Sequence, residues 1–89
     1  MTKSTHTPEY RHLVELLIET RREAKLTQQQ LANRLGKPQS YVAKVEGAER
    51  RIDVVEFAKL AKAMDESPTV LLDRLLTDIE KLERVQDFP

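Results

Sequence analysis

Residues 27–47, TQQQLANRLGKPQSYVAKVEG, contain two short helix patterns joined by a glycine. Thr27 and Gln30 have the spacing of a capping box, in which each side chain bonds to the free backbone N–H of the other residue. The first helix therefore begins at Gln28. It ends at Gly36, because glycine takes the left-handed backbone conformation at a helix end without steric cost. The stretch predicts a short helix that stops at a tight turn.

The second helix pattern follows a proline. Pro38 lies two residues beyond the glycine, where it cannot continue the first helix but can open another. We expect the second helix to run from about Pro38 to Glu46 and to end at Gly47. Its inward side is formed by Val42 and Val45. Its outward side is formed by Gln39, Ser40, Ala43 and Lys44. We expect Glu46, at the end of this helix, to have a structural role by pairing with an arginine or with free N–H groups.

One further helix precedes this stretch. Thr7 supplies a capping hydroxyl and Pro8 has the backbone angle of a first helical residue. The helix is expected to run to about Lys25. Its apolar residues recur at helical spacing and are Tyr10, Leu13, Val14 and Leu17.

Two more helices follow. Asp53 and Glu56 form a second cap-like pair, before apolar residues at helical spacing, which are Val54, Phe57, Ala58, Ala61 and Met64. Ser67 and Pro68 start the last helix, whose apolar residues include Leu71, Leu72, Leu75 and Leu76. A heptad-like stripe extends that helix to about Val85 and consists of Leu72, Leu75, Ile79 and Leu82. This stripe is either the edge of the core or a dimer contact, and we favour the dimer contact.

Composition limits the class of protein. The chain has 89 residues, of which 34% are charged and 4% aromatic, as expected for a single helical domain over residues 1–89. It contains no cysteine, which excludes disulfides and thiolate metal sites. The apolar runs are far shorter than the roughly 20 residues that span a bilayer, and no signal core precedes them. We expect an all-α cytoplasmic protein that does not contact membranes.

The charges are unevenly distributed. The net charge is zero, but residues 1–51 hold ten Lys or Arg against six Asp or Glu, and residues 52–89 hold five against nine. The two parts therefore carry charges of +4 and −4. Such asymmetry suggests a basic face for a polyanion and an acidic face for solvent or a protein partner.

Residues 26–76 resemble the Cro/CI-type (XRE) helix-turn-helix domain of phage repressors. The resemblance implies an all-α, five-helix, lambda-repressor-like DNA-binding domain over residues 8–76, with the helix-turn-helix motif at residues 28–47. Residues 77–89 then form a C-terminal extension, with a dimer contact as its expected role. The motif positions have geometric reasons: a small residue for close helix crossing, a glycine for the turn and two buried residues for the inner side of the second helix. These positions are Ala32, Gly36, Val42 and Val45.

The second helix of the motif then presents side chains that can contact base edges in the major groove. Gln39 can make a bidentate contact to adenine, Ser40 can bond to any base, and Lys44 can donate to guanine or to a phosphate. Tyr41 either contacts DNA or covers the edge of the core. By resemblance, Gln28 at the start of the preceding helix contacts a phosphate. Further phosphate contacts are expected from Lys37, Arg50 and Arg51.

Three positions depart from the family pattern. Lys37 stands where an apolar residue is usual, Pro38 replaces a capping Ser or Thr, and Ala48 stands where glycine is common. We expect Gly47 to make the turn in place of residue 48.

The sequence thus predicts a transcriptional regulator, repressor-like and homodimeric, on an inverted-repeat operator in double-stranded DNA. Two alternatives remain: an antitoxin whose acidic C-terminal half binds a toxin, and a protein-interaction module that does not bind DNA. His6 and His12 have neither a cysteine nor a histidine partner at helical spacing, so we expect no metal site. No cofactor and no catalytic residue is predicted, because no nucleophile, base and orienting group cluster in the sequence.

Overall fold

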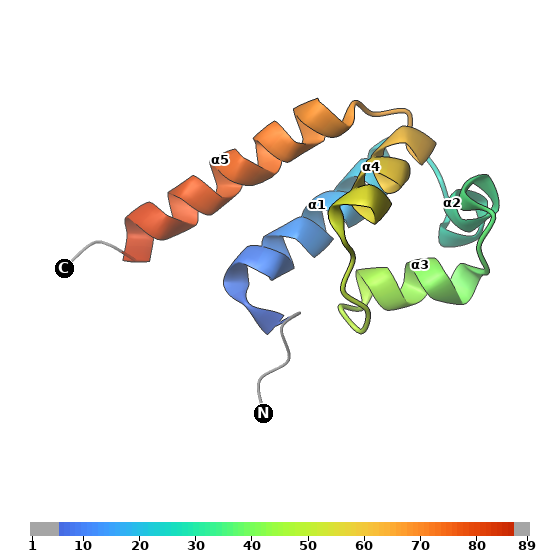
Figure 1. Ribbon diagram of the computed structural model, residues 1–89, viewed down its shortest axis with the longest axis horizontal. Coiled ribbons are helices and arrows are strands. Elements are labelled where there is room, and N and C mark those ends of the chain that lie inside the picture. The colour runs from blue at the N-terminus through green and yellow to red at the C-terminus, as the bar shows by residue number, and fades with distance from the viewer. Residues whose placement is uncertain (1–5, 87–89) are drawn as a thin grey trace.

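The computed structural model describes residues 6–86, which form five α-helices and no β-strand (Figure 1). The helices are α1 (Pro8–Glu23), α2 (Gln28–Leu35), α3 (Gln39–Glu46), α4 (Val54–Ala63) and α5 (Pro68–Gln86). The predicted all-α, five-helix fold class is confirmed. Residues 87–89 of the predicted C-terminal extension lie outside the described residues.

The helix starts follow the predicted capping residues. The Thr7 hydroxyl accepts a backbone N–H of α1 at 3.1 Å. Thr27 and Gln30 form a complete capping box at the start of α2, and Asp53 and Glu56 form a second one at the start of α4. Because each box satisfies backbone N–H groups that a helix leaves free, local sequence determines where α2 and α4 begin.

The start of α3 differs from the prediction by one residue. Pro38 is the residue before α3, with an extended backbone at φ −71° and ψ 156°, and its side chain caps nothing. The Lys37 N–H bonds to the Ala32 carbonyl at 3.0 Å, which closes the turn after α2. The chain leaves this turn extended and becomes helical only at Gln39. Pro38 still contributes its carbonyl, which accepts the Tyr41 N–H at 3.0 Å.

The end of α3 also corrects an expectation. Gly47 has an ordinary φ of −85°, and the left-handed conformation falls on Ala48, at φ 56°. The expectation that Gly47 makes the turn was therefore wrong. The turn is fixed by two backbone bonds across it, from Ala48 N–H to the Val45 carbonyl at 3.2 Å and from Glu49 N–H to the Lys44 carbonyl at 2.9 Å. A left-handed L-residue costs about 1–2 kcal/mol.

All five helices contribute to one apolar core. Its most completely buried large side chains are Leu31, Leu71, Val42 and Val45. The core also contains the predicted residues Phe57 and Ala61 of α4 and Met64 at its C-cap, and Leu60 joins them. Val54, which has the same helical spacing, is 75% exposed, because it is the first residue of α4 and lies at the rim of the packed region.

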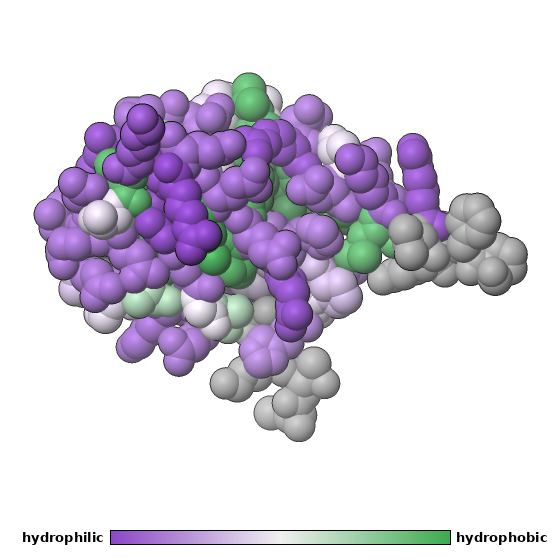
Figure 2. Space-filling model, turned by 180° about the vertical axis from the view of Figure 1, so that it is seen from behind, coloured by the Kyte–Doolittle hydropathy of each residue, from purple (hydrophilic) through white to green (hydrophobic). Residues whose placement is uncertain are grey.

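The helix arrangement leaves one face of α3 and the end of α5 outside the core. α3 packs on α2 and α1, and lies along the lower edge of the molecule in Figure 1. α5 packs against α1 and α4, and its C-terminal end projects beyond the other helices. From behind, Figure 2 shows a mostly hydrophilic surface with small, separate hydrophobic patches. No helix within the described part of the chain has the length and apolar character of a membrane span.

Candidate nucleic-acid interface

α2, the turn and α3 form a helix-turn-helix unit whose inner side is fully buried. Gly36 adopts φ 67°, the left-handed conformation predicted for the turn. Ala32 is 0% exposed, as expected for the small motif residue of α2. Val42 and Val45 are 1% and 2% exposed and anchor α3 in the core. Ala32, Val42 and Val45 are buried and Gly36 is left-handed, as expected of the four motif residues, and the inner side of α3 packs into the core.

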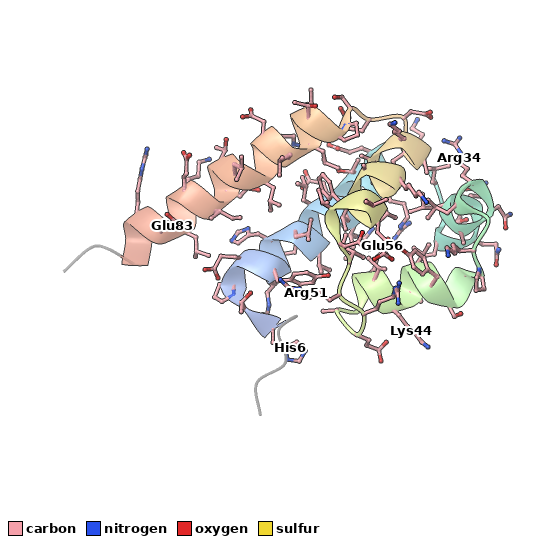
Figure 3. The ribbon with its side chains drawn as sticks, in the orientation of Figure 1. His6, Arg34, Lys44, Arg51, Glu56 and Glu83 are labelled. Carbon is pink, nitrogen blue, oxygen red and sulfur yellow. The ribbon has the colours of Figure 1, made fainter. Side chains whose placement is uncertain are left out.

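The outer face of α3 carries exposed polar side chains. Gln39, Ser40 and Lys44 are all exposed, and Figure 3 shows Lys44 pointing away from the domain at its lower edge. These residues are one, two and six positions into an eight-residue helix. An α-helix with its side chains is about 10–12 Å in diameter, which fits a major groove about 12 Å wide.

Side chains from α1 and α2 are hydrogen-bonded to both ends of α3. Arg21 at the end of α1 forms a bidentate ion pair with Glu46, from Nε to Oε2 at 2.6 Å and from Nη2 to Oε1 at 3.0 Å. The Gln28 amide nitrogen donates to the same Glu46 Oε1 at 2.9 Å. The Gln39 amide nitrogen then donates to Gln28 Oε1 at 2.8 Å. A continuous series of bonds therefore connects the core to the first residue of α3.

This series fixes the orientation of the Gln39 side chain. A glutamine amide has two N–H donors and one carbonyl acceptor, and Gln39 uses one N–H on Gln28. The other N–H and the carbonyl are the two groups that a bidentate contact to adenine requires. Gln28 likewise keeps one N–H after donating to Glu46. The geometry therefore leaves both glutamines with the donors that their predicted contacts need.

The Arg21–Glu46 ion pair is nearly buried, with side-chain exposures of 11% and 8%. Arg21 also donates to the Leu26 carbonyl at 2.8 Å, so its guanidinium is satisfied on two sides. The prediction that Glu46 pairs with an arginine is confirmed, and the partner belongs to α1 and not to the loop that follows α3. This pair connects α3 to α1 across the base of the motif.

A second polar cluster joins α3 to α4. Glu56 Oε2 accepts the Tyr41 hydroxyl at 2.7 Å and Arg50 Nη2 at 2.7 Å. The Arg50 guanidinium also lies 5.1 Å from the centre of the Tyr41 ring. Hydrogen bonding to Arg50, and then to Tyr41, lowers the pKa of Glu56 to about 2. Burial and the nearby Glu56 raise the pKa of Tyr41.

The remaining predicted phosphate contacts lie on both sides of α3. Lys37 is exposed in the turn before α3, with its Nζ 5.5 Å from the Tyr41 ring centre. Arg51 is exposed after α3, and its guanidinium lies 4.9 Å from the ring centre of Tyr10 (Figure 3). The Tyr10 hydroxyl accepts the Ile52 N–H at 3.0 Å, so α1 fixes the backbone beside Arg51.

Sequence reasoning missed three sets of contacts in this region: those of Arg21 with Glu46, of Tyr10 with the Ile52 backbone, and of Glu56 with Tyr41 and Arg50. Arg21 had a signal, because it continues the inward spacing of Val14 and Leu17 and is a charged residue on a buried face. Such a residue requires a partner. Glu56 was predicted as a capping residue, and nothing in the sequence pointed to its additional bonds with Tyr41 and Arg50.

Comparison with known proteins agrees with this geometry. A family model described as helix-turn-helix matches residues 17–71, more than half of the chain. An XRE-family like protein from Pseudomonas syringae pv. tomato str. DC3000, of known structure, shares 44% sequence identity and superposes with a TM-score of 0.77. That match covers 83% of this chain and 90% of the other. No curated protein matches the chain.

Proposed function

The chain belongs to the XRE-type helix-turn-helix family of DNA-binding regulators, and on this premise we propose that it is a sequence-specific transcriptional repressor. In this proposal α3 enters the major groove of an operator, and a homodimer binds the two halves of an inverted repeat. The chain acts by binding, without catalysis or a cofactor, in the cytoplasm.

The observation that carries the proposal is the contrast between the two sides of α3. Val42 and Val45 are almost completely buried, whereas Gln39 and Lys44 are exposed on the opposite side. A helix supported in this way can enter a groove without unfolding or repacking the domain. Its polar side then faces the base edges, where hydrogen bonds distinguish one sequence from another.

We assign base contacts to three residues of α3. Gln39 pairs with adenine through its remaining N–H and its carbonyl, Lys44 donates to guanine or to a nearby phosphate, and Ser40 bonds to a base between them. Tyr41 lies beside these residues, but its hydroxyl is bonded to Glu56. We therefore assign Tyr41 to the support of α3 and not to base recognition.

Contacts to the DNA backbone come from the residues around α3. The free N–H of Gln28 lies at the N-terminus of α2, where the helix dipole attracts a phosphate. Lys37 and Arg51 are exposed on either side of α3 and supply positive charge. Each phosphate that such residues neutralise contributes about 0.9 to the dependence of log K on log salt.

We assign dimerisation to α5. Leu72 and Leu76 are 42% and 48% exposed and lie one helical turn apart, next to the side that Leu75 packs on the core. Neighbouring exposed leucines on one helix face form an apolar patch of the kind that a protein partner covers. A second copy of α5 is the proposed occupant, since one recognition helix contacts few base pairs and a dimer joins two half-sites about 34 Å apart. Leu76→Glu should then produce monomers in sedimentation equilibrium and weaken operator binding.

The test is selection of bound sites from a random pool of duplexes. The proposal expects an inverted repeat with half-site centres about one helical turn apart. Enrichment of a single half-site would mean that the protein recognises a sequence but does not bind it as a dimer. Absence of binding at every salt concentration would remove DNA binding altogether and leave a protein partner, through the acidic C-terminal half, as the function to pursue.

A further inference from the structure

Glu56 has more hydrogen-bond partners than its place in a capping box requires. Its Oε1 accepts the Asp53 N–H at 3.1 Å, which completes the cap of α4. Its Oε2 accepts both the Tyr41 hydroxyl and Arg50 Nη2, each at 2.7 Å. Figure 3 shows Glu56 between the start of α4 and α3. One carboxylate thus joins the recognition helix, the following loop and α4.

The bond to Glu56 changes the electrostatic role of Arg50. This arginine follows α3, where a basic side chain could reach the DNA backbone, and 47% of its side chain is exposed. Its guanidinium is turned toward Glu56 and lies over the Tyr41 ring. An arginine bonded to a carboxylate forms a neutral pair. Such a pair releases no counterion from DNA, unlike a free arginine that neutralises a phosphate.

We propose that Glu56 is an affinity-determining residue that holds Arg50 away from the DNA backbone. This inference rests on the proposed DNA-binding function. It replaces the expectation that Arg50 contacts a phosphate. Glu56 then lowers affinity for all sequences alike, and the base contacts of α3 make up a larger share of the binding energy. A regulator with weaker nonspecific binding is less often held at the many competing sites of a genome.

The testing variant is Glu56→Gln, which removes the charge and keeps the shape. Glutamine is accepted at this position of a capping box, where its carbonyl accepts the Asp53 N–H, and its amide N–H can then donate to the Tyr41 hydroxyl oxygen. Thermal unfolding establishes that the variant is folded. With random-sequence duplex as the probe, we expect its log K against log salt to be steeper than that of the wild type by about 0.9. Between 0.05 and 0.2 M salt, its affinity should therefore fall by an additional factor of about 3.5.

Glu49→Gln is the matched control. Glu49 lies exposed in the same loop and, among the described residues, no arginine bonds to its carboxylate. This substitution removes the same charge without releasing an arginine, so its slope should stay close to that of the wild type. The double variant Glu56→Gln with Arg50→Gln should lose the steeper slope, because the released side chain is then uncharged.

The outcomes separate the two proposals. If the wild type binds duplex with a salt-dependent affinity and Glu56→Gln has the same slope, the role of Glu56 is wrong and DNA binding stands. The role of Glu56 is also wrong if Glu49→Gln has an equally steeper slope of log K against log salt, or if the steeper slope persists in the double variant. Either result would be a general effect of charge. If neither the wild type nor Glu56→Gln binds DNA, both proposals fail.

Discussion

The side-chain amide nitrogen of Gln39 lies 2.8 Å from the amide oxygen of Gln28, so the first residue of α3 is held by the first residue of α2. Gln28 is itself held by Glu46, at 2.9 Å. The direction of the Gln39 amide is therefore fixed before any DNA arrives. A preorganised contact loses less conformational entropy on binding than a mobile one.

Gln28 should therefore affect base discrimination although it contacts no base. We expect Gln28→Ala to weaken binding to all sequences, by loss of a phosphate donor, and to reduce the energetic effect of Gln39→Ala. In a double-mutant cycle on the selected duplex, the two substitutions should couple by at least about 0.5 kcal/mol. Gln29→Ala is the control, because within residues 6–86 the Gln29 side chain bonds to Asn33 of its own helix and to no residue of α3. A coupling energy of zero between Gln28 and Gln39 contradicts the account.

The Arg21–Glu46 pair should be important for stability. Glu46→Gln leaves the Arg21 guanidinium nearly buried beside a neutral partner, and we expect a loss of about 3–5 kcal/mol in the free energy of unfolding. Urea denaturation followed by circular dichroism measures this loss. A control replaces both residues, Arg21→Met with Glu46→Met, and should be less destabilising than the single change because no charge is left unpaired. Equal losses in the two variants would mean that the ion pair is not the cause.

Ala48 is a site where a single substitution should stabilise the fold. Its φ of 56° is strained for alanine and free for glycine. Ala48→Gly should raise the free energy of unfolding by about 0.5–1 kcal/mol, since relief of strain exceeds the added freedom of the unfolded chain. The matched control is Ala58→Gly inside α4, which should cost about 0.5–1 kcal/mol. Destabilisation by Ala48→Gly would show that its backbone is not left-handed in solution.

Glu56 should also determine part of the acid stability. Its pKa in the folded protein is about 2, against an ordinary value of 4.5, so folding favours the charged carboxylate. The resulting stabilisation is complete above about pH 4.5 and is lost as the pH falls through about 2. Melting temperatures from pH 7 to pH 2 should therefore decline more steeply in wild type than in Glu56→Gln. Parallel curves for the two proteins would mean that the carboxylate has no such partner.

The sequence predicts most of this fold because its signals are local. Capping boxes at Thr27 and Asp53 and the glycine at position 36 act within a few residues, and the structure confirms all three. The end of α3 at Glu46 was predicted correctly, but the left-handed residue of the turn after it was not, because glycine preference pointed to Gly47. The position of the turn is set instead by backbone bonds that place Ala48 in the left-handed conformation.

The hydrogen bonds and ion pairs that hold the candidate interface in place were harder to predict, because they join distant parts of the chain. Arg21 and Glu46 are 25 residues apart, and Tyr10 accepts an N–H from a residue 42 positions away. The exposed residues of α3 could be named from spacing and side-chain chemistry. The tertiary bonds that orient Gln39 and restrain Arg50 follow only from the packing of the helices.

The most direct test of base recognition by α3 compares wild type with Gln39→Ala on duplexes in which each base pair of the selected site is changed in turn. We expect wild type to lose about 1–3 kcal/mol of binding free energy at one base pair of each half-site, and Gln39→Ala no longer to distinguish that pair. At every other position of the site, the order of preferred base pairs should be the same for both proteins. If Gln39→Ala weakens binding equally at every position, or has no effect, α3 does not recognise bases through Gln39.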